Sequence, residues 1–214
     1  MNSLIEIIPS LFESRLCDLD LPRNTVPKKQ AEQLFLYFKH HPLFKWNDAN
    51  NGCEGRADAI CVLLDEWNIP NYKGWVFSGF YLKKHVGALQ QNWNYHVAAV
   101  LAVEEDGMVK DYVIDPATNN NLLTIDEWAI SVTELPHSYY FTRQSHWYIF
   151  PAKKISTSTW NSRNNQNRKW MIQCLAGINS LTPTGKAELT FNKLRLRNTE
   201  EAFKKLKREK PRFG

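Results

Sequence analysis

The sequence contains few cysteines and no pattern typical of a metal or cofactor site. The adjacent His40 and His41 lack an evident third ligand. The four cysteines form neither a CxxC pair nor a Cys/His metal spacing; they are Cys17, Cys53, Cys61 and Cys174. The sequence therefore gives no indication of a disulfide framework, and we expect neither a metal nor a cofactor.

Long apolar runs are also absent. The stretch Leu4–Ile8 is mostly apolar, but it is much shorter than the apolar core of a signal peptide and has no basic segment before it. No run is long enough to cross a membrane. We therefore expect no membrane span and two alternative locations. These are the cytoplasm, or export by a system that reads other signals, including delivery into a host cell.

Apolar and basic residues are plentiful. The 214 residues are 43% hydrophobic and include eight tryptophans, which predicts one folded domain with elaborations. The net charge is +5, with much of the excess near the C-terminus. No nucleic-acid-binding motif accompanies these bases, so no nucleic acid partner is expected. We divide the chain into an N-terminal helical extension (1–45), a central domain (46–181) and a basic C-terminal helix and tail (182–214).

One cysteine stands between a turn and the start of a helix. Asn51-Gly52 is a turn dipeptide. The apolar residues that follow recur at helical spacing, at Ala57, Ile60, Leu64 and Trp67. A helix from about Cys53 to Trp67 would place the Cys53 thiol beside unpaired N–H groups and the positive end of the helix dipole. Both favour a thiolate. The alternative is that Cys53 is a small buried apolar residue.

Two later segments predict neighbouring strands that carry a histidine and an acid. In the run 93–103, His96 shares one face with Ala98, and the other face is apolar as well. The run 111–116 ends in Asp115-Pro116. The turn residues 104–107 between the runs predict a hairpin, which would bring His96 and Asp115 together. With Cys53 they would form a nucleophile, a base and an orienting acid.

Each of these assignments has an alternative. His96 alone could be a core histidine bonded to a backbone carbonyl, and Asp115 alone could be a turn residue at the Asp-Pro bend. His137 and His146 are rival bases. Neither lies on a predicted strand followed by a matching acid, so we rank both below His96.

The motifs around these three residues resemble a known family. The order of a helix cysteine, a strand histidine and an aspartate on the next strand is that of the transglutaminase-like superfamily of papain-type thiol enzymes. Three segments are most similar to bacterial protein-glutaminase: Asn51-Gly52-Cys53-x-x-Arg56-Ala57, Trp93-x-Tyr95-His96-Val97-Ala98 and Ile114-Asp115-Pro116. The resemblance covers about residues 46–117. It implies an α+β, transglutaminase-like (papain-like) core, with the nucleophile helix packed on an antiparallel sheet.

The resemblance also implies an activity and a set of site residues. Protein-glutaminases hydrolyse glutamine side-chain amides in proteins to glutamate and ammonia, so the expected partner is a protein with an accessible glutamine. If the chain is exported into a host cell, that partner would be a host protein. Cys53 would be the nucleophile, His96 the base and Asp115 the orienter. The candidate substrate-contacting residues are Trp46, Asn51, Arg56, Trp93 and Tyr95.

Three other functions remain open at this point. A transglutaminase would use the same triad and transfer the acyl group to a lysine amine instead of water. A thiol peptidase would cleave the backbone, although the usual papain-like sequence around the nucleophile is absent. A catalytically silent binding module could share the fold. Glu54 and Arg56, in the first helical turn, could contact substrate or simply lie at the surface.

The remaining segments predict further elements around this site. We expect helices over 28–40, from 124 with Thr124 and Glu127 as a capping box, over 168–178 and over 199–208. We expect strands over 73–81, 138–141 and 146–150, and a polar connection over 83–92. The last helix is expected to be mainly solvated and followed by a loose tail. Weak attraction to an anionic partner is the alternative for that segment.

Overall fold

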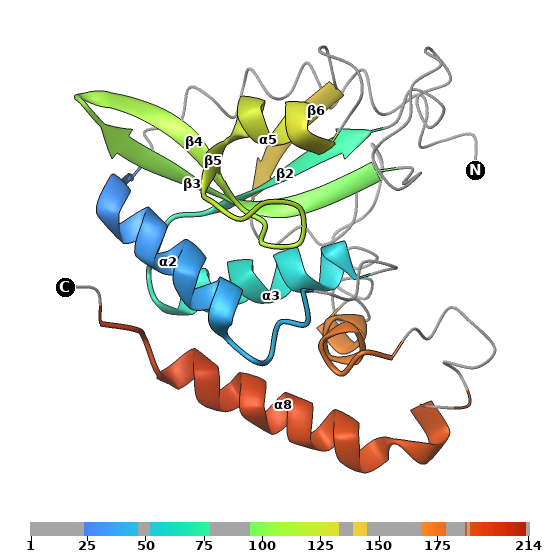
Figure 1. Cartoon of the computed structure of the whole chain (residues 1–214). Helices are drawn as coiled ribbons and strands as arrows, with labels where there is room; N and C mark the ends of the chain where they lie inside the picture. The colour runs from blue at the N-terminus through green and yellow to red at the C-terminus, as the bar shows by residue number, and fades with distance from the viewer. Residues whose placement is uncertain are drawn as a thin grey trace, which may run out of the picture.

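A six-stranded sheet forms the centre of the protein (Figure 1). The computed structural model describes residues 24–46, 52–77, 95–132, 139–144, 168–178, 187 and 189–212. The strands are β1 (Val26–Pro27), β2 (Tyr72–Phe77), β3 (Tyr95–Glu105), β4 (Met108–Ile114), β5 (Leu123–Thr124) and β6 (Tyr139–Gln144). The helices are α2 (Lys28–His40), α3 (Cys53–Glu66), α5 (Ile125–Val132) and α8 (Lys193–Arg208), together with a helical stretch over 168–175.

Strand β3 organises the sheet. The order is β5-β4-β3-β2-β6, and β1 pairs in parallel with β3 at Val103. Strands β2 and β4 each pair antiparallel with β3. The expected hairpin over 104–107 is confirmed: Asp106 and Gly107 connect β3 to β4, with φ values of 53° and 74°. Two positive φ values suit the two-residue turns that match the twist of paired strands.

The two faces of the sheet are covered by different helices (Figure 1). On one face, Ala98 and Val100 of β3 pack with Ile125 and Trp128 of α5. On the other face, the alternate residues of β3 pack with α2, α3 and part of α8. The predicted alternation along β3 is confirmed, because a strand buried on both faces needs apolar residues on both.

Helices α2 and α3 form the larger core layer. The predicted apolar stripe of α2 is confirmed, and its buried members are Ala31, Leu34, Phe35 and Phe38. Helix α3 is buried on more than one side, and Cys61 lies in the core as expected. Its Asp58 is fully buried and pairs with Lys73 of β2 at 2.8 Å, and also with Arg168 of the 168–175 stretch. This charge cluster links three elements beneath the sheet.

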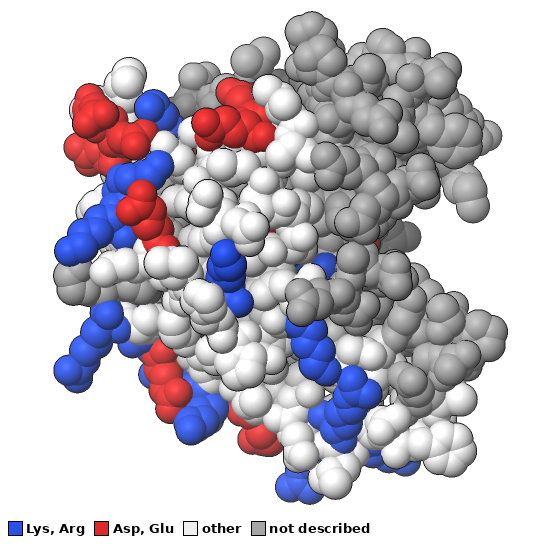
Figure 2. All heavy atoms as spheres, in the orientation of Figure 1, with Lys and Arg blue, Asp and Glu red and all other residues white. Residues whose placement is uncertain are grey.

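Helix α8 begins earlier than the sequence predicted and is docked on the molecule. Phe203 and Leu206 are buried in the same core as α2 and α3. Lys207 pairs with Glu66 at 2.8 Å, and the Trp67 indole N–H donates to the Lys207 carbonyl at 3.2 Å. Most other residues of α8 are exposed, so the expectation of a mainly solvated helix is confirmed, with Phe203 and Leu206 as its buried contacts. Seven bases and two acids lie on α8, and basic side chains gather where α8 runs in Figure 2.

Several expectations lie partly or wholly outside the described residues. Strand β2 is described as far as Phe77, β6 covers the strand expected from 138, and the helix expected over 168–178 spans 168–175. The connection 83–92 and the strand 146–150 are not among the described residues. No helix in the described part of the chain is long and apolar enough to cross a membrane. The boundaries of the three predicted segments stay a prediction.

Candidate active site

Cys53 is the first residue of α3, as the turn and the helical spacing predicted. Gly52 precedes it with φ 100° and ψ 12°, a left-handed conformation that glycine adopts without a steric penalty. The carbonyl of Gly52 accepts the N–H of Arg56 at 2.9 Å and closes the first helical turn. The N–H groups of the residues before Arg56 have no partner within a helix at this position.

His96 and Asp115 are joined across neighbouring strands. The register places Ala99 of β3 opposite Ile114, the last residue of β4, which brings the residue after β4 beside the start of β3. The His96 Nε2 lies 2.8 Å from Oδ2 of Asp115, and the two residues are 1% and 4% exposed. The predicted proximity of histidine and acid is therefore observed.

Two further side chains hold the Asp115 carboxylate in place. The Thr118 hydroxyl donates to Oδ2 of Asp115 at 2.5 Å, and the Trp128 indole N–H donates to the same oxygen at 2.9 Å. Burial raises the pKa of Asp115, but the charge of His96 and these hydrogen bonds outweigh it. The pKa is lowered to about 2 from its ordinary value of 3.8. Asp115 is therefore a fixed negative charge behind the imidazole.

Thr118 and Trp128 were not identified from the sequence. Thr118 follows Asp115 by three residues, a spacing typical of an aspartate turn, and its N–H bonds the Asp115 carbonyl at 3.2 Å. Trp128 has no local signal, because it reaches Asp115 from α5. That helix begins with the predicted capping box, in which Glu127 accepts the Thr124 N–H at 2.9 Å. The ring of Trp128 also lies 5.8 Å from that of His96.

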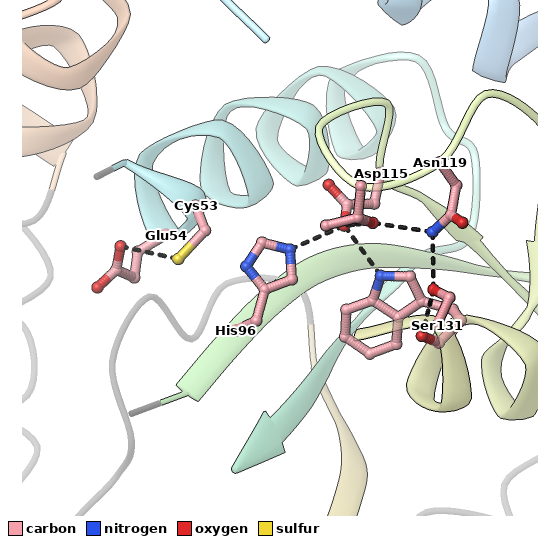
Figure 3. Close-up of polar contacts among 8 residues, drawn as sticks. Cys53, Glu54, His96, Asp115, Asn119 and Ser131 are labelled. Carbon is pink, nitrogen blue, oxygen red and sulfur yellow. Dashed lines mark hydrogen bonds and ion pairs between the residues drawn. The ribbon is translucent and has the colours of Figure 1, made fainter. Parts of the chain in front are cut away.

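Cys53 faces His96 across the site. Figure 3 shows the Cys53 sulfur between the Glu54 carboxylate, toward which it points, and the His96 ring, with Asp115 on the far side of the ring. Because Nε2 is bonded to Asp115, the other ring nitrogen, Nδ1, is the one available to exchange a proton with the thiol. The three residues that the sequence singled out thus lie in the order thiol, imidazole, carboxylate.

The thiol itself is not activated in this arrangement. Burial raises the pKa of Cys53 well above its ordinary value, and the Glu54 carboxylate raises it further. Arg56 and a hydrogen bond with the Val97 backbone act in the opposite direction. The expectation that the helix start favours a thiolate is outweighed here, because desolvation and a neighbouring negative charge both favour the neutral thiol.

The candidate substrate-contacting residues divide into two groups. Arg56 is 8% exposed, and its guanidinium carbon lies 5.6 Å from the centre of the Trp46 ring. The Tyr95 hydroxyl donates to Oε1 of Glu54, and its ring lies 5.6 Å from that of Trp75. Trp46, Arg56 and Tyr95 therefore have defined partners around the start of α3. Asn51 and Trp93 lie outside the described residues, as do the rival bases His137 and His146.

The pair His40 and His41 is not part of a metal site among the residues that the structure describes. Within these residues, no group of three or more histidine, cysteine, aspartate or glutamate side chains is arranged to hold an ion. The Nδ1 of His41 accepts the N–H of Leu43 at 3.2 Å. Burial lowers the pKa of His41. His41 thus has a local structural role at the end of α2.

Comparison with known proteins gives one family and one fold. Residues 31–132 match the model of a family described as Glutaminase. A crystal structure of protein-glutaminase is 15% identical, with 71% of this chain and 89% of that chain covered and a TM-score of 0.50. The NMR structure of protein-glutaminase from Chryseobacterium proteolyticum is also 15% identical, with 65% of this chain and 84% of that chain covered and a TM-score of 0.48.

A crystal structure of pro-protein-glutaminase is 18% identical, with 60% of this chain and 53% of that chain covered and a TM-score of 0.46. No curated protein matches the sequence. The architecture is the transglutaminase-like α+β fold that the sequence predicted, with α3 packed on an antiparallel sheet. The segment that matches the glutaminase family model, residues 31–132, contains Cys53, His96 and Asp115.

Proposed function

We propose that this protein is a thiol amidohydrolase that deamidates glutamine side chains in protein substrates, with Cys53, His96 and Asp115 as its catalytic residues. The observation that carries the proposal is their arrangement: a cysteine at a helix start faces an imidazole that is bonded to a buried carboxylate. The glutaminase family match over the same residues supports amide hydrolysis. The protein-glutaminase structures support a glutamine within a protein as the substrate.

The first half of the reaction forms a thioester. His96 takes the thiol proton through Nδ1, and the Cys53 thiolate attacks the carboxamide carbon of the glutamine side chain. The N–H of Cys53 is a donor for the negative charge that develops on the amide oxygen. His96 then gives its proton to the leaving nitrogen. The carbon–nitrogen bond breaks, and ammonia departs.

The second half consumes one water. His96 removes a proton from the water as its oxygen attacks the thioester carbon. The carbon–sulfur bond breaks, and the thiolate regains a proton from His96. The sum is glutamine plus water giving glutamate plus ammonia. Within each half, Asp115 stabilises the imidazolium that forms after His96 takes a proton and before it gives the proton away. Asp115 also fixes the ring orientation, as an acid in this position does in other triads.

The test is ammonia release from a glutamine-rich protein, with mass spectrometry to locate each amide converted to an acid. The native protein should release ammonia, and Cys53→Ala should release none. Cys61→Ala is the matched control, because Cys61 lies on the same helix but is buried in the core. Its activity per folded molecule should stay close to native.

Three other outcomes would replace the proposal. Incorporation of an amine at the glutamine, with ammonia released but no glutamate formed, would identify a transglutaminase. Backbone cleavage that depends on Cys53 would identify a peptidase. Ammonia release that survives Cys53→Ala would show that the activity does not depend on this thiol and would contradict the proposed site.

The proposed partner is a protein that presents an accessible glutamine. We further propose that the chain acts on one preferred protein, which would be a host protein if the chain is delivered into a host cell. Free glutamine should then be turned over much more slowly than the protein target. Equal turnover of free glutamine would contradict a dedicated protein target.

A further inference from the structure

The carboxylate of Glu54 lies directly beside the reactive sulfur. The Cys53 thiol donates to Oε2 of Glu54 at 3.2 Å, and the Tyr95 hydroxyl donates to Oε1 of the same carboxylate. Both oxygens therefore have a donor, and the side chain is held from two directions. Figure 3 shows Glu54 and His96 on opposite sides of the Cys53 sulfur.

This contact competes with the catalytic one. A thiol has one proton to donate, and in this arrangement the proton is directed to Glu54 and not to His96. A negative charge beside the sulfur also disfavours the thiolate. The charge of Glu54 adds to burial in raising the pKa of Cys53. Glu54 therefore holds the nucleophile in its resting form.

Within the described part of the chain, the hydrogen-bond donors to the Glu54 carboxylate carry no charge. Among the same residues, no lysine, arginine or histidine forms an ion pair with this carboxylate. Arg56 is near enough to lower the pKa of Cys53, but its guanidinium lies over the Trp46 ring. Glu54 is half-buried at the start of α3.

We propose that Glu54 is a specificity-determining residue, which releases the Cys53 thiol to His96 when a lysine or arginine near the target glutamine binds the Glu54 carboxylate. The inference rests on the proposed function, since it names the class of glutamine that this site prefers. A cation bound to Glu54 neutralises the charge that opposes the thiolate. An acidic neighbour would add to that charge and leave the thiol protonated.

The geometry sets where the basic residue must lie. In the attack, the amide carbon of the glutamine bonds to the Cys53 sulfur, and Oε2 of Glu54 is 3.2 Å from that sulfur. In an extended chain adjacent side chains point to opposite faces, and residues two apart share a face about 6.6 Å apart along the strand. A long basic side chain two residues from the glutamine, the next one on the same face, can therefore reach Glu54 while the amide is in place.

The experiment compares three peptides that differ at the residue two positions from one glutamine, the next one on the same face: lysine, the uncharged isostere norleucine, or glutamate. For the native protein, kcat/KM should be roughly tenfold higher with lysine than with norleucine, the effect of a thiol pKa one unit lower. It should be lower again with glutamate. In Glu54→Gln, which keeps the side-chain size without the charge, the three peptides should react at similar rates.

A second measurement does not need turnover. Alkylation of Cys53 by iodoacetamide, followed at its own peptide by mass spectrometry across pH, reports the pKa of the thiol. In Glu54→Gln the alkylation profile should move to lower pH. Tyr95→Phe, which removes one donor to Glu54 and keeps the ring, should retain the preference for lysine over glutamate because the charge is still present.

The outcomes separate this inference from the proposed function. Ammonia release at equal rates from all three peptides would overturn the role of Glu54 and leave deamidation intact. An unchanged alkylation profile in Glu54→Gln would overturn it as well. No ammonia from any peptide or protein would refute the proposed function itself. A different result would be that Glu54→Gln abolishes incorporation of an added amine at the glutamine and leaves the preference among the three peptides unchanged. That result would assign Glu54 to binding the incoming amine and contradict the inference.

Discussion

His96 and Asp115 are bonded through one specific pair of atoms, Nε2 and Oδ2, at 2.8 Å in a buried site. This contact decides which ring nitrogen is left for the thiol, because an imidazole bonded to a carboxylate through Nε2 exchanges protons through Nδ1. The contact also raises the free energy of unfolding. The carboxylate is ionised in the folded protein at pH values where an unfolded chain would be protonated.

The first prediction follows from the low pKa of Asp115. Its folded value of about 2 lies below the ordinary 3.8, so ionisation stabilises the fold above about pH 4, and the effect is lost as the pH falls toward 2. By linkage the contribution is about 2 kcal/mol near neutral pH. The unfolding free energy of Asp115→Asn should therefore be lower than native at pH 7, and the difference should shrink between pH 4 and pH 2. Denaturant titrations at several pH values measure it.

Trp128→Phe is the matched control for that experiment. It keeps a ring against His96 and removes one of the three donors to Asp115. The difference in unfolding free energy between pH 7 and pH 2 should be smaller in Trp128→Phe than in the native protein, but it should not disappear. A native protein whose stability is the same at pH 2 and pH 7, relative to Asp115→Asn, would contradict an ionised carboxylate held by these partners.

The second prediction concerns the close contact between α3 and the helical stretch 168–175. A Cβ added to Gly55 would lie 2.5 Å from Cβ of Cys174 and 3.0 Å from its sulfur. Alanine is normally the better helix former, but here the clash should dominate. Gly55→Ala should destabilise the protein by roughly 1–3 kcal/mol, the usual cost of overpacking. Urea unfolding measures the loss.

Variants at Cys174 test the stated cause. Cys174→Ala keeps the Cβ atom and should not rescue Gly55→Ala, whereas Cys174→Gly removes it and should rescue part of the loss. The coupling in this double-mutant cycle should be favourable and at least about 0.5 kcal/mol. Full stability of Gly55→Ala alone would show that the two helices are not in close contact.

Local sequence patterns were enough to identify Cys53, His96 and Asp115. Helical spacing after Asn51-Gly52 placed Cys53 at the start of α3, and the period-two alternation with a two-residue turn paired β3 with β4. The fold class was what the resemblance of the surrounding motifs to protein-glutaminase implies. Residues that continue a regular local pattern are predictable, because the pattern fixes their backbone and therefore their direction.

The contacts that modify those residues follow no local pattern. Trp128 donates a hydrogen bond to Asp115 from α5, 13 positions later in the chain. Tyr95 donates a hydrogen bond to Glu54, 41 positions earlier in the chain. The sequence also did not predict that the pKa of the Cys53 thiol is raised. The helix dipole can be inferred from position alone, but desolvation and the direction of the Glu54 side chain depend on the assembled site.

The last prediction concerns the buried pair of Asp58 and Lys73, whose side chains are 0% and 1% exposed and 2.8 Å apart. Asp58 also accepts from Arg168, so it pairs with two cations. Asp58→Asn should cost about 3–5 kcal/mol, because it removes the carboxylate that pairs with a buried ammonium. Lys73→Met should cost less, because Arg168 still pairs with Asp58.

The double variant Asp58→Asn/Lys73→Met distinguishes an ion pair from two independent side chains. Removing Lys73 also removes the buried ammonium that makes Asp58→Asn costly, so the double variant should lose less stability than the sum of the single losses. Urea unfolding at neutral pH gives all three values. Additive losses, or a larger loss from Lys73→Met than from Asp58→Asn, would contradict the shared role of Asp58. The expected asymmetry would instead identify Asp58 as the charge that fixes α3, and with it Cys53, against β2 and the helical stretch 168–175.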